Sequence, residues 1–212
     1  FTMIHHFCNS DLSAFYFDIR KDLLYCGDVA STERRACRTV MDILFDTLVV
    51  WLAPILTFTA EEAWQTRYPD PKNSVHFQIF PDLPDTWLDE TLGHRWAKIR
   101  QARLVVTGAI EKARNAGVMK SSLQAHPTLY APKAVIDAFV GLDAAEVFIT
   151  SSADLVEAKP AEDAHLDEDY PDIGVTIALA DGDKCDRCWK ILPELVHEDH
   201  HLCGRCHDVI SG

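Results

Sequence analysis

Apolar residues recur every three to five positions along residues 1–26, which is the spacing of an amphipathic α-helix. Gly27 interrupts this pattern and is predicted to end the helix. A second helix is expected to begin with Ser31 or Thr32 as its N-cap. Its apolar stripe continues to Pro54, where the ring ends or bends a helix.

The stretch "TAEE" (59–62) has the spacing of a capping box, with Thr59 and Glu62 three residues apart. It predicts the start of a short third helix. Three helices on short connections, each with one apolar face, predict a helical bundle. The segment 74–85, "SVHFQIFPDLPD", is punctuated by proline and is predicted to be an extended linker that wraps this bundle.

The second half of the chain mixes helical and strand patterns. A long amphipathic helix is predicted from Leu92 to Ala113, ending at Gly117. A small α+β unit should follow, with strands at 127–132, 145–150 and 173–180 and a helix over 133–142. Residues 157–172 are acidic and contain two prolines, which predicts a mobile surface loop.

The last residues, "KCDRCWKILPELVHEDHHLCGRCHDVISG", hold two C-x-x-C pairs with fourteen residues between them. Two such pairs supply the tetrahedral four-thiolate site typical of structural zinc. The predicted ligands are Cys185, Cys188, Cys203 and Cys206. A Zn²⁺ ion with four thiolates has a net charge of −2. An arginine lies between the cysteines of each pair, and its positive charge would offset part of this negative charge.

Other fates of these cysteines remain possible from the residues alone. They include free thiols in an unstructured tail and iron in the same cage, although zinc is favoured. Disulfides are disfavoured because no signal peptide is visible and three other cysteines form an odd set. Cys8, Cys26 and Cys37 are predicted to be small buried fillers. The cysteine usage fits a reducing cytoplasm.

The net charge of −13 argues against a nucleic-acid partner, since phosphate contacts drive that affinity. The charge is uneven, however: residues 143–172 hold ten acidic residues and one lysine, whereas 88–126 hold seven basic and three acidic residues. Local potential decides binding.

The longest apolar run, 47–60, is shorter than the about 20 residues that span a bilayer. Phe1 begins inside a helical pattern, which suggests a fragment of a longer protein.

Several stretches in order resemble one known family. They are "DLSAFYFDIRKDLLYC" (11–26), "LAPILTFTAEEAW" (52–64), "VHFQIFP" (75–81), "RWAKIRQARLVVTGAIEKARNAGVMKSSLQA" (95–125) and the closing four-cysteine segment. This series resembles the C-terminal region of bacterial isoleucyl-tRNA synthetases, a class I family. Valyl, leucyl and methionyl relatives share the helical domain, but the terminal finger favours the isoleucyl enzymes.

The resemblance implies a mainly α fold: a helical bundle of the anticodon-binding type, a small α+β unit and a C-terminal zinc finger. The expected domains are 1–82, the anticodon-binding bundle; 83–181, the long helix and α+β junction unit with the acidic loop 157–172; and 182–212, the zinc finger, called here the finger.

The family attaches isoleucine to its tRNA using ATP and edits mischarged valine. Its catalytic signatures are absent from this chain, and "VMKSS" (118–122) resembles one of them only by accident. ATP and Mg²⁺ are therefore expected only in a catalytic domain that the chain lacks, and no catalytic residue is predicted here. The resemblance implies isoleucine tRNA as the partner, no membrane, a monomeric parent enzyme and a cytoplasmic location.

Candidate tRNA contacts are basic and aromatic residues, since RNA loops bind aromatic or arginine planes and cations. They are Lys184, Arg187, Trp189, Lys190 and Arg205 in the finger, and Arg34, Arg35 and Arg38 on the second helix. The helix arginines could instead face water, and Trp189 could pack over the metal site. His197, His200, His201 and His207 are expected near the metal or on the surface rather than as ligands. Alternatives are the nucleic-acid-binding tail of a DNA glycosylase and a zinc-stabilised protein-interaction module.

Overall fold

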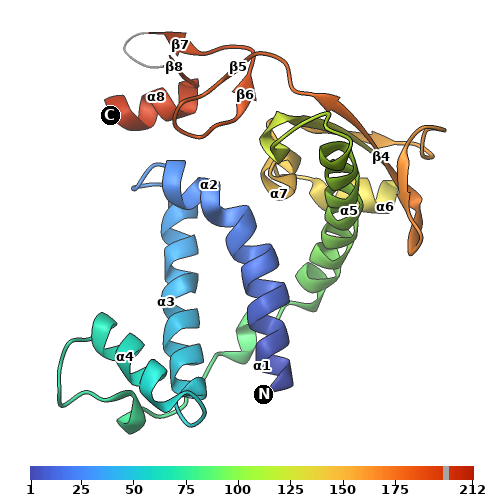
Figure 1. Ribbon diagram of the computed structural model, residues 1–212. Coiled ribbons are helices and arrows are strands. Elements are labelled where there is room, and N and C mark those ends of the chain that lie inside the picture. Colours follow the sequence, from blue (N-terminus) through green and yellow to red (C-terminus); the bar gives the residue numbers. More distant parts are fainter. Residues whose placement is uncertain (198–200) are drawn as a thin grey trace. The chain divides into compact units, whose positions relative to one another are not determined.

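A computed structural model describes residues 1–197 and 201–212 of the chain (Figure 1). The described chain is mainly helical, with a small four-stranded sheet and a cysteine cluster near its end, as predicted. It divides into two compact units, residues 28–89 and residues 1–27 with 90–212. The division into domains 1–82, 83–181 and 182–212 stays a prediction.

The unit 28–89 is built on α3 (Thr32–Leu52) and α4 (Thr57–Arg67). The predicted N-cap of α3 is confirmed: the Ser31 hydroxyl accepts a hydrogen bond from the amide of Arg34 at 3.2 Å. The capping box at 59–62 is wrong. After Pro54 a tight turn places the Leu56 carbonyl to accept from the Ala60 amide, so α4 begins two residues before Thr59.

The segment 74–85 wraps this unit at its beginning. A 3₁₀ turn, η2 (Val75–Phe77), places Val75 in a cluster with Val50, Trp64 and neighbouring residues, where Val75 is 1% exposed. The Glu61 carboxylate fastens the turn by accepting from the Ser74 hydroxyl at 2.8 Å and from the Val75 amide at 2.9 Å. A second 3₁₀ turn, η3 (Asp85–Trp87), leads out of the unit.

The other unit begins with a continuous helical segment, as predicted. It consists of α1 (Thr2–His6), a π-helical stretch η1 (Phe7–Phe17) and α2 (Asp18–Cys26). The predicted long helix is α5 (Glu90–Asn115), which ends where Gly117 takes a left-handed conformation at φ 76°. Six of its apolar side chains are at most 4% exposed: Ile99, Ala102, Val105, Val106, Ala109 and Ile110. They form the core against the sheet.

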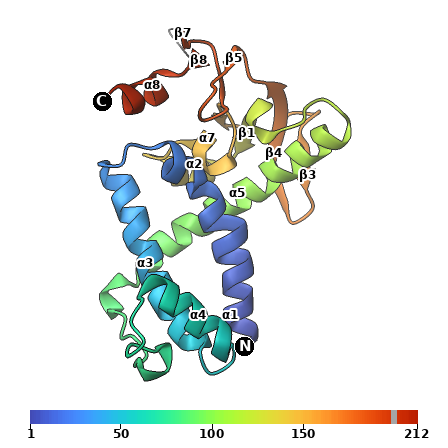
Figure 2. The ribbon, with the colours of Figure 1, turned by 60° about the vertical axis from the view of Figure 1, so that its left-hand side comes forward.

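The sheet has the order β2 (Asp154–Glu157), β1 (Ala125–Ala131), β4 (Tyr170–Leu179), β3 (His165–Asp167). Strands β1 and β2 are parallel, whereas β4 is antiparallel to both of its neighbours. Figures 1 and 2 show α5 lying against this sheet, in contact with β4 and β3. After η4 (Ser122–Gln124) and β1 come α6 (Lys133–Ile136), η5 (Asp137–Phe139) and α7 (Ala144–Phe148).

Two predictions for this region are wrong. Residues 145–150 are not a strand. Residues 145–148 belong to α7, because the Asp143 carboxylate accepts a hydrogen bond from the Ala145 amide at 2.9 Å and caps the helix. Ile149 then ends the helix in the left-handed region at φ 57°. Residues 157–172 are not one loop either. β3 and the start of β4 lie within them, joined by a turn in which the Asp167 side chain accepts from the Asp169 amide at 3.0 Å.

The finger contains two small hairpins and a helix. β5 (Asp183–Lys184) pairs with β6 (Ile191–Leu192), β7 (Val196–His197) pairs with β8 (His201–Leu202), and α8 is Gly204–Ser211. Among the residues that the structure describes, no helix is both long enough and apolar enough to span a bilayer.

Gly182, just before β5, should not tolerate a side chain. Its φ is 107°, and a Cβ atom would lie 2.1 Å from the carbonyl oxygen of Leu192. We expect Gly182→Ala to lower the free energy of unfolding by about 1–3 kcal/mol or more, measured by urea denaturation. Gly93→Ala is the control, because nothing lies near that position on α5 and alanine favours a helix. Equal stability of the two variants would contradict the strained geometry.

Candidate metal centre and the surface around it

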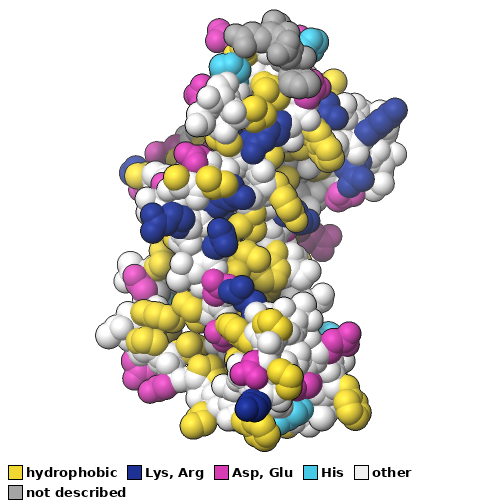
Figure 3. All heavy atoms as spheres, turned by 90° about the vertical axis from the view of Figure 1, so that its left-hand side faces the viewer, with side chains coloured by type: hydrophobic (Ala, Val, Ile, Leu, Met, Phe, Trp, Pro, Cys, Tyr) yellow, Lys and Arg dark blue, Asp and Glu magenta, His cyan; other side chains and the backbone are white. Residues whose placement is uncertain are grey.

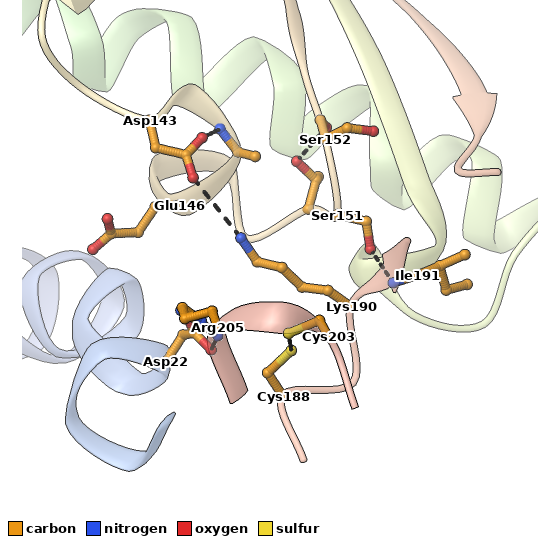
Figure 4. Close-up of polar contacts among 12 residues, drawn as sticks. Asp22, Asp143, Glu146, Ser151, Ser152, Cys188, Lys190, Ile191, Cys203 and Arg205 are labelled. Atoms are coloured by element: carbon orange, nitrogen blue, oxygen red, sulfur yellow. Dashed lines mark hydrogen bonds and ion pairs between the residues drawn. The ribbon is translucent and has the colours of Figure 1, made fainter. Parts of the chain in front are cut away.

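The four predicted cysteines lie together. The sulfur atoms of Cys185, Cys188, Cys203 and Cys206 are all within 4.8 Å of one another, and each residue is at most 8% exposed. Cys185 and Cys188 lie in the turn between β5 and β6, whereas Cys203 is the N-cap of α8 and Cys206 lies in its first turn. Figure 4 shows Cys188 and Cys203 facing each other across the two turns.

The donor set fits a tetrahedral divalent ion. A zinc–sulfur bond of about 2.3 Å in a tetrahedron separates neighbouring sulfurs by about 3.8 Å. The Cys188 and Cys203 sulfurs are 3.8 Å apart, far beyond the length of a disulfide bond. Every cysteine is a free thiol in this structure. The four sulfurs are therefore arranged as metal ligands and not as disulfides.

The backbone around the sulfurs supports a thiolate. Burial raises the pKa of Cys185, but amides including those of Cys188 and Cys203 donate to its sulfur and bring the pKa down to about 6. Burial raises the pKa of Cys188 and of Cys203. Cys185 is thus set up to ionise near neutral pH, and an ion with two positive charges favours the thiolate form of its ligands.

The two arginines between the cysteines contact the end of α2. The Arg187 guanidinium donates to the carbonyl oxygens of Cys26 at 2.6 Å and Tyr25 at 3.3 Å. Arg205 donates through two nitrogens to both carboxylate oxygens of Asp22, one of them at 2.9 Å. Figure 4 shows Arg205 beside Asp22. The guanidinium groups of these two predicted tRNA contacts therefore already have hydrogen-bond partners within the chain.

Charge is retained in the pair of Arg205 and Asp22. Burial works against ionisation of Asp22, but the hydrogen bonds and charge of Arg205 outweigh it and lower the pKa of the carboxyl group. The hydrogen bonds to Asp22 raise the pKa of Arg205. Both groups are ionised at neutral pH, so the contact is a charge-assisted bidentate pair, the strong form of hydrogen bond in proteins.

The rest of the first C-x-x-C turn is anchored to the α+β region. The Ile191 amide donates to the Ser151 hydroxyl at 2.6 Å, and Ser151 is 6% exposed. The Lys190 ammonium lies 3.9 Å from the Asp143 carboxylate, with only 15% of its side chain exposed. Both contacts are visible in Figure 4. Lys190 is therefore partly withdrawn from the surface as well.

Trp189 and Lys184 are exposed predicted contacts of the finger, and no hydrogen bond or ion pair to another part of the described chain is seen for their side chains. Trp189 is 60% exposed and does not belong to the buried cluster around the cysteines, so the interpretation that it packs over the metal site is wrong. Its backbone is left-handed, with φ 66°. The Lys184 ammonium lies 5.1 Å from the centroid of the indole, a cation–π contact. In the space-filling view of Figure 3, basic side chains are interspersed with apolar ones on the exposed surface.

The three helix arginines lie in the first two turns of α3, in the compact unit 28–89. Arg35 and Arg38 are exposed, and Arg34 is half-buried. They remain candidate tRNA contacts.

A cavity of about 530 Å³ lies beside the metal centre, within the unit 1–27 and 90–212. One wall is α2, from Asp18 to Cys26. Another is the first C-x-x-C turn, from Arg187 to Lys190, and α7 with Leu123 completes it. The cavity and the contact of Asp22 could not be predicted from the sequence, because the segments that form them are far apart in the chain.

The other cysteines and the described histidines are not part of the candidate metal cluster. Cys26 and Cys37 are buried, as predicted, and Cys8 is half-buried. His207 lies 3.6 Å from Asp208, and among the described residues the candidate metal cluster contains only the four cysteines. His200 lies outside the described residues, and so does the side chain of His197.

Comparison with known families matches this arrangement. Residues 1–129 match the family model described as "Anticodon-binding domain of tRNA ligase", and residues 182–209 match "Zinc finger found in FPG and IleRS". The first match covers more than half of the chain. The chain therefore belongs to the anticodon-binding domain family of tRNA ligases.

Individual relatives narrow the resemblance to one kind of ligase. The chain is 47% identical over 210 residues to an isoleucine–tRNA ligase of Gluconobacter oxydans, covering 98% of this chain and 21% of that protein. The enzyme of Zymomonas mobilis is 44% identical, covering 99% of this chain and 21% of its own length. The Caulobacter vibrioides enzyme is 45% identical over 89% of this chain. The chain spans about a fifth of the length of these relatives, and the resemblance seen in the sequence is confirmed.

Proposed function

We propose that this chain is the part of an isoleucine–tRNA ligase that binds the anticodon arm of its tRNA. One observation carries the proposal: the anticodon-binding match and a match to the zinc finger found in FPG and IleRS occur in order in one chain. Joining isoleucine to tRNA with ATP and Mg²⁺, and editing, belong to other parts of the ligase. The whole enzyme is proposed to be cytoplasmic and monomeric.

The finger is proposed to hold one Zn²⁺ through Cys185, Cys188, Cys203 and Cys206. The separation and burial of the four sulfurs support this assignment. A closed four-thiolate site leaves no position for substrate, so the ion supplies folding energy and takes no part in ligation.

Exposure, together with contacts inside the protein, separates the candidate RNA contacts into two groups. Trp189 and Lys184 offer an aromatic plane and a cation at the surface, the combination that binds an unstacked base with its phosphate. Arg35 and Arg38 offer cations on α3. Arg187 and Arg205 are proposed only for long-range attraction, since their guanidinium groups already hold α2.

The proposal is tested by one titration with three ligands: isoleucine tRNA, a different tRNA and a DNA duplex of similar length. We expect the isoleucine tRNA to bind most tightly, with affinity that falls as salt increases. Tightest binding to the DNA duplex would favour the glycosylase-type alternative, whose finger belongs to the same matched family. Absence of binding to any nucleic acid would favour a protein-interaction module.

Removing the indole of Trp189 should weaken tRNA binding, whereas removing another exposed indole should not. Base–aromatic stacking contributes about 1–3 kcal/mol, so Trp189→Ala should weaken binding by about 5- to 150-fold. Lys184→Gln should lower the salt slope by about one phosphate contact. Trp87→Ala is the matched control, because that indole is 59% exposed and lies outside the candidates. Equal losses for the two tryptophan variants would remove Trp189 from the site.

A further inference from the structure

The first C-x-x-C turn is attached to the last turn of α2. The Arg187 guanidinium donates to two carbonyls there, Tyr25 and Cys26, which have no partner inside the helix because it ends at this point. A cation at a helix C-terminus is also favoured by the helix dipole. In return, the Cys26 thiol donates to the carbonyl oxygen of Arg187 at 3.7 Å. Cys26 is 7% exposed and packs in the same cluster as the four cysteines.

The second C-x-x-C turn is attached to the same helix one turn earlier. Arg205 makes its bidentate contact with Asp22, whose side chain is 27% exposed. Each C-x-x-C turn therefore sends one arginine to α2. Since each arginine lies in the chain between two metal ligands, an ion that fixes both turns also fixes the origin of both side chains.

We propose that Arg187 and Arg205 are positioning residues through which the bound ion holds the last turn of α2, Asp22 to Cys26. This inference rests on the proposed metal binding. The two arginines, which the sequence predicted to contact RNA, thereby have a structural role inside the protein. The inference also means that the ion organises a segment more than 150 residues away in the chain, in addition to the finger itself.

The cavity beside the metal centre follows from the same attachment. Its walls are α2 on one side and Arg187 to Lys190 on the other, so it keeps its shape only while the finger is attached to α2. Two of the carboxylates that line it are paired: Asp22 with Arg205, and Glu146 with Arg20 at 2.8 Å. Trp189 belongs to the same turn as Arg187 and is placed by the same contacts.

Hydrogen exchange on the whole chain tests the inference, with zinc content measured on the same samples. The amides of residues 23–27 should exchange about tenfold faster or more after zinc is removed with a chelator, because the last helical turn loses its attachments. The amides in the centre of α5 should not change. This arm needs no variant and cannot fail through misfolding of one.

Variants in the zinc-loaded chain separate positioning from general stability. Arg205→Gln and Asp22→Asn should each speed exchange at residues 23–27, and the double variant should be no faster than either single one. The exchanged pair, R205D with D22R, should restore slow exchange. Arg114→Gln is the control, since it breaks an exposed pair with Glu111 on α5.

The outcomes distinguish the two proposals. A chain that holds no zinc when purified under reducing conditions overturns the metal site itself. A zinc-loaded chain whose residues 23–27 exchange at the same rate before and after chelation overturns the positioning role while leaving the metal site in place. Additive effects of the Arg205 and Asp22 variants also overturn it.

Discussion

Removal of the metal should unfold the finger and leave the rest of the chain folded, apart from the last turn of α2. A segment of 29 residues, 184–212, buries too little apolar surface to fold alone. Among its described residues, the buried hydrophobic side chains are the four cysteines and Leu202. Structural zinc contributes about 10–16 kcal/mol in small fingers, so it supplies most of the folding free energy here.

Limited proteolysis with and without a chelator measures this effect. New cleavage should appear within residues 184–212 and at most also at the last turn of α2, while α3, α5 and the sheet stay protected. Cys206→Ser should reproduce the result without a chelator, because three thiolates leave the tetrahedron open and Cys206 is fully buried. Cys8→Ser is the control, a half-buried cysteine outside the cluster. A finger that resists protease after complete loss of metal would show that zinc has no structural role.

The metal ligands were predictable because their signal is local. A C-x-x-C pair brings two sulfurs to one centre through a single turn, so its geometry is written in four consecutive residues. The long helices were predictable for a related reason. α3 and α5 are 21 and 26 residues long, and a stripe repeated over that length outweighs any single unfavourable residue.

The roles of Arg187 and Arg205 were not predictable from spacing. Their partners on α2 lie 161 and 183 residues away in the chain, and nothing near Asp22 indicates that an arginine will reach it. An arginine beside a metal ligand has the same local sequence whether it binds a phosphate or a helix end. Only the fold decides between the two.

The prediction of a short strand at 145–150 was wrong for a different reason. Residues 145–150 contain Val147 and Ile149, whose branched side chains favour a strand. The segment is nevertheless helical, because Asp143 caps its start and the buried face of α7 packs on the core. Over five residues, one cap and one packing face outweigh propensity, and neither is visible in a strand-like pattern.

Phe148→Ala in α7 should strongly destabilise the unit 1–27 and 90–212. Phe148 is 3% exposed, and its ring lies 5.4 Å from that of Phe139 at an angle of 58°. Replacing a buried phenylalanine by alanine costs about 3–5 kcal/mol, since the cavity is only partly refilled. The loss of the aromatic pair adds to this cost.

Urea denaturation monitored by circular dichroism measures this loss as a lower midpoint. Phe148→Leu should retain most of the stability, since it removes less volume. Val140→Ala is the control, because Val140 is 71% exposed and a surface substitution stays within about 0.5 kcal/mol. If 145–150 were a surface strand, Phe148→Ala would behave like this control. A loss of several kcal/mol would also weaken the finger, since α7 carries Glu146, the partner of Arg20 on α2, and lines the cavity that the finger completes.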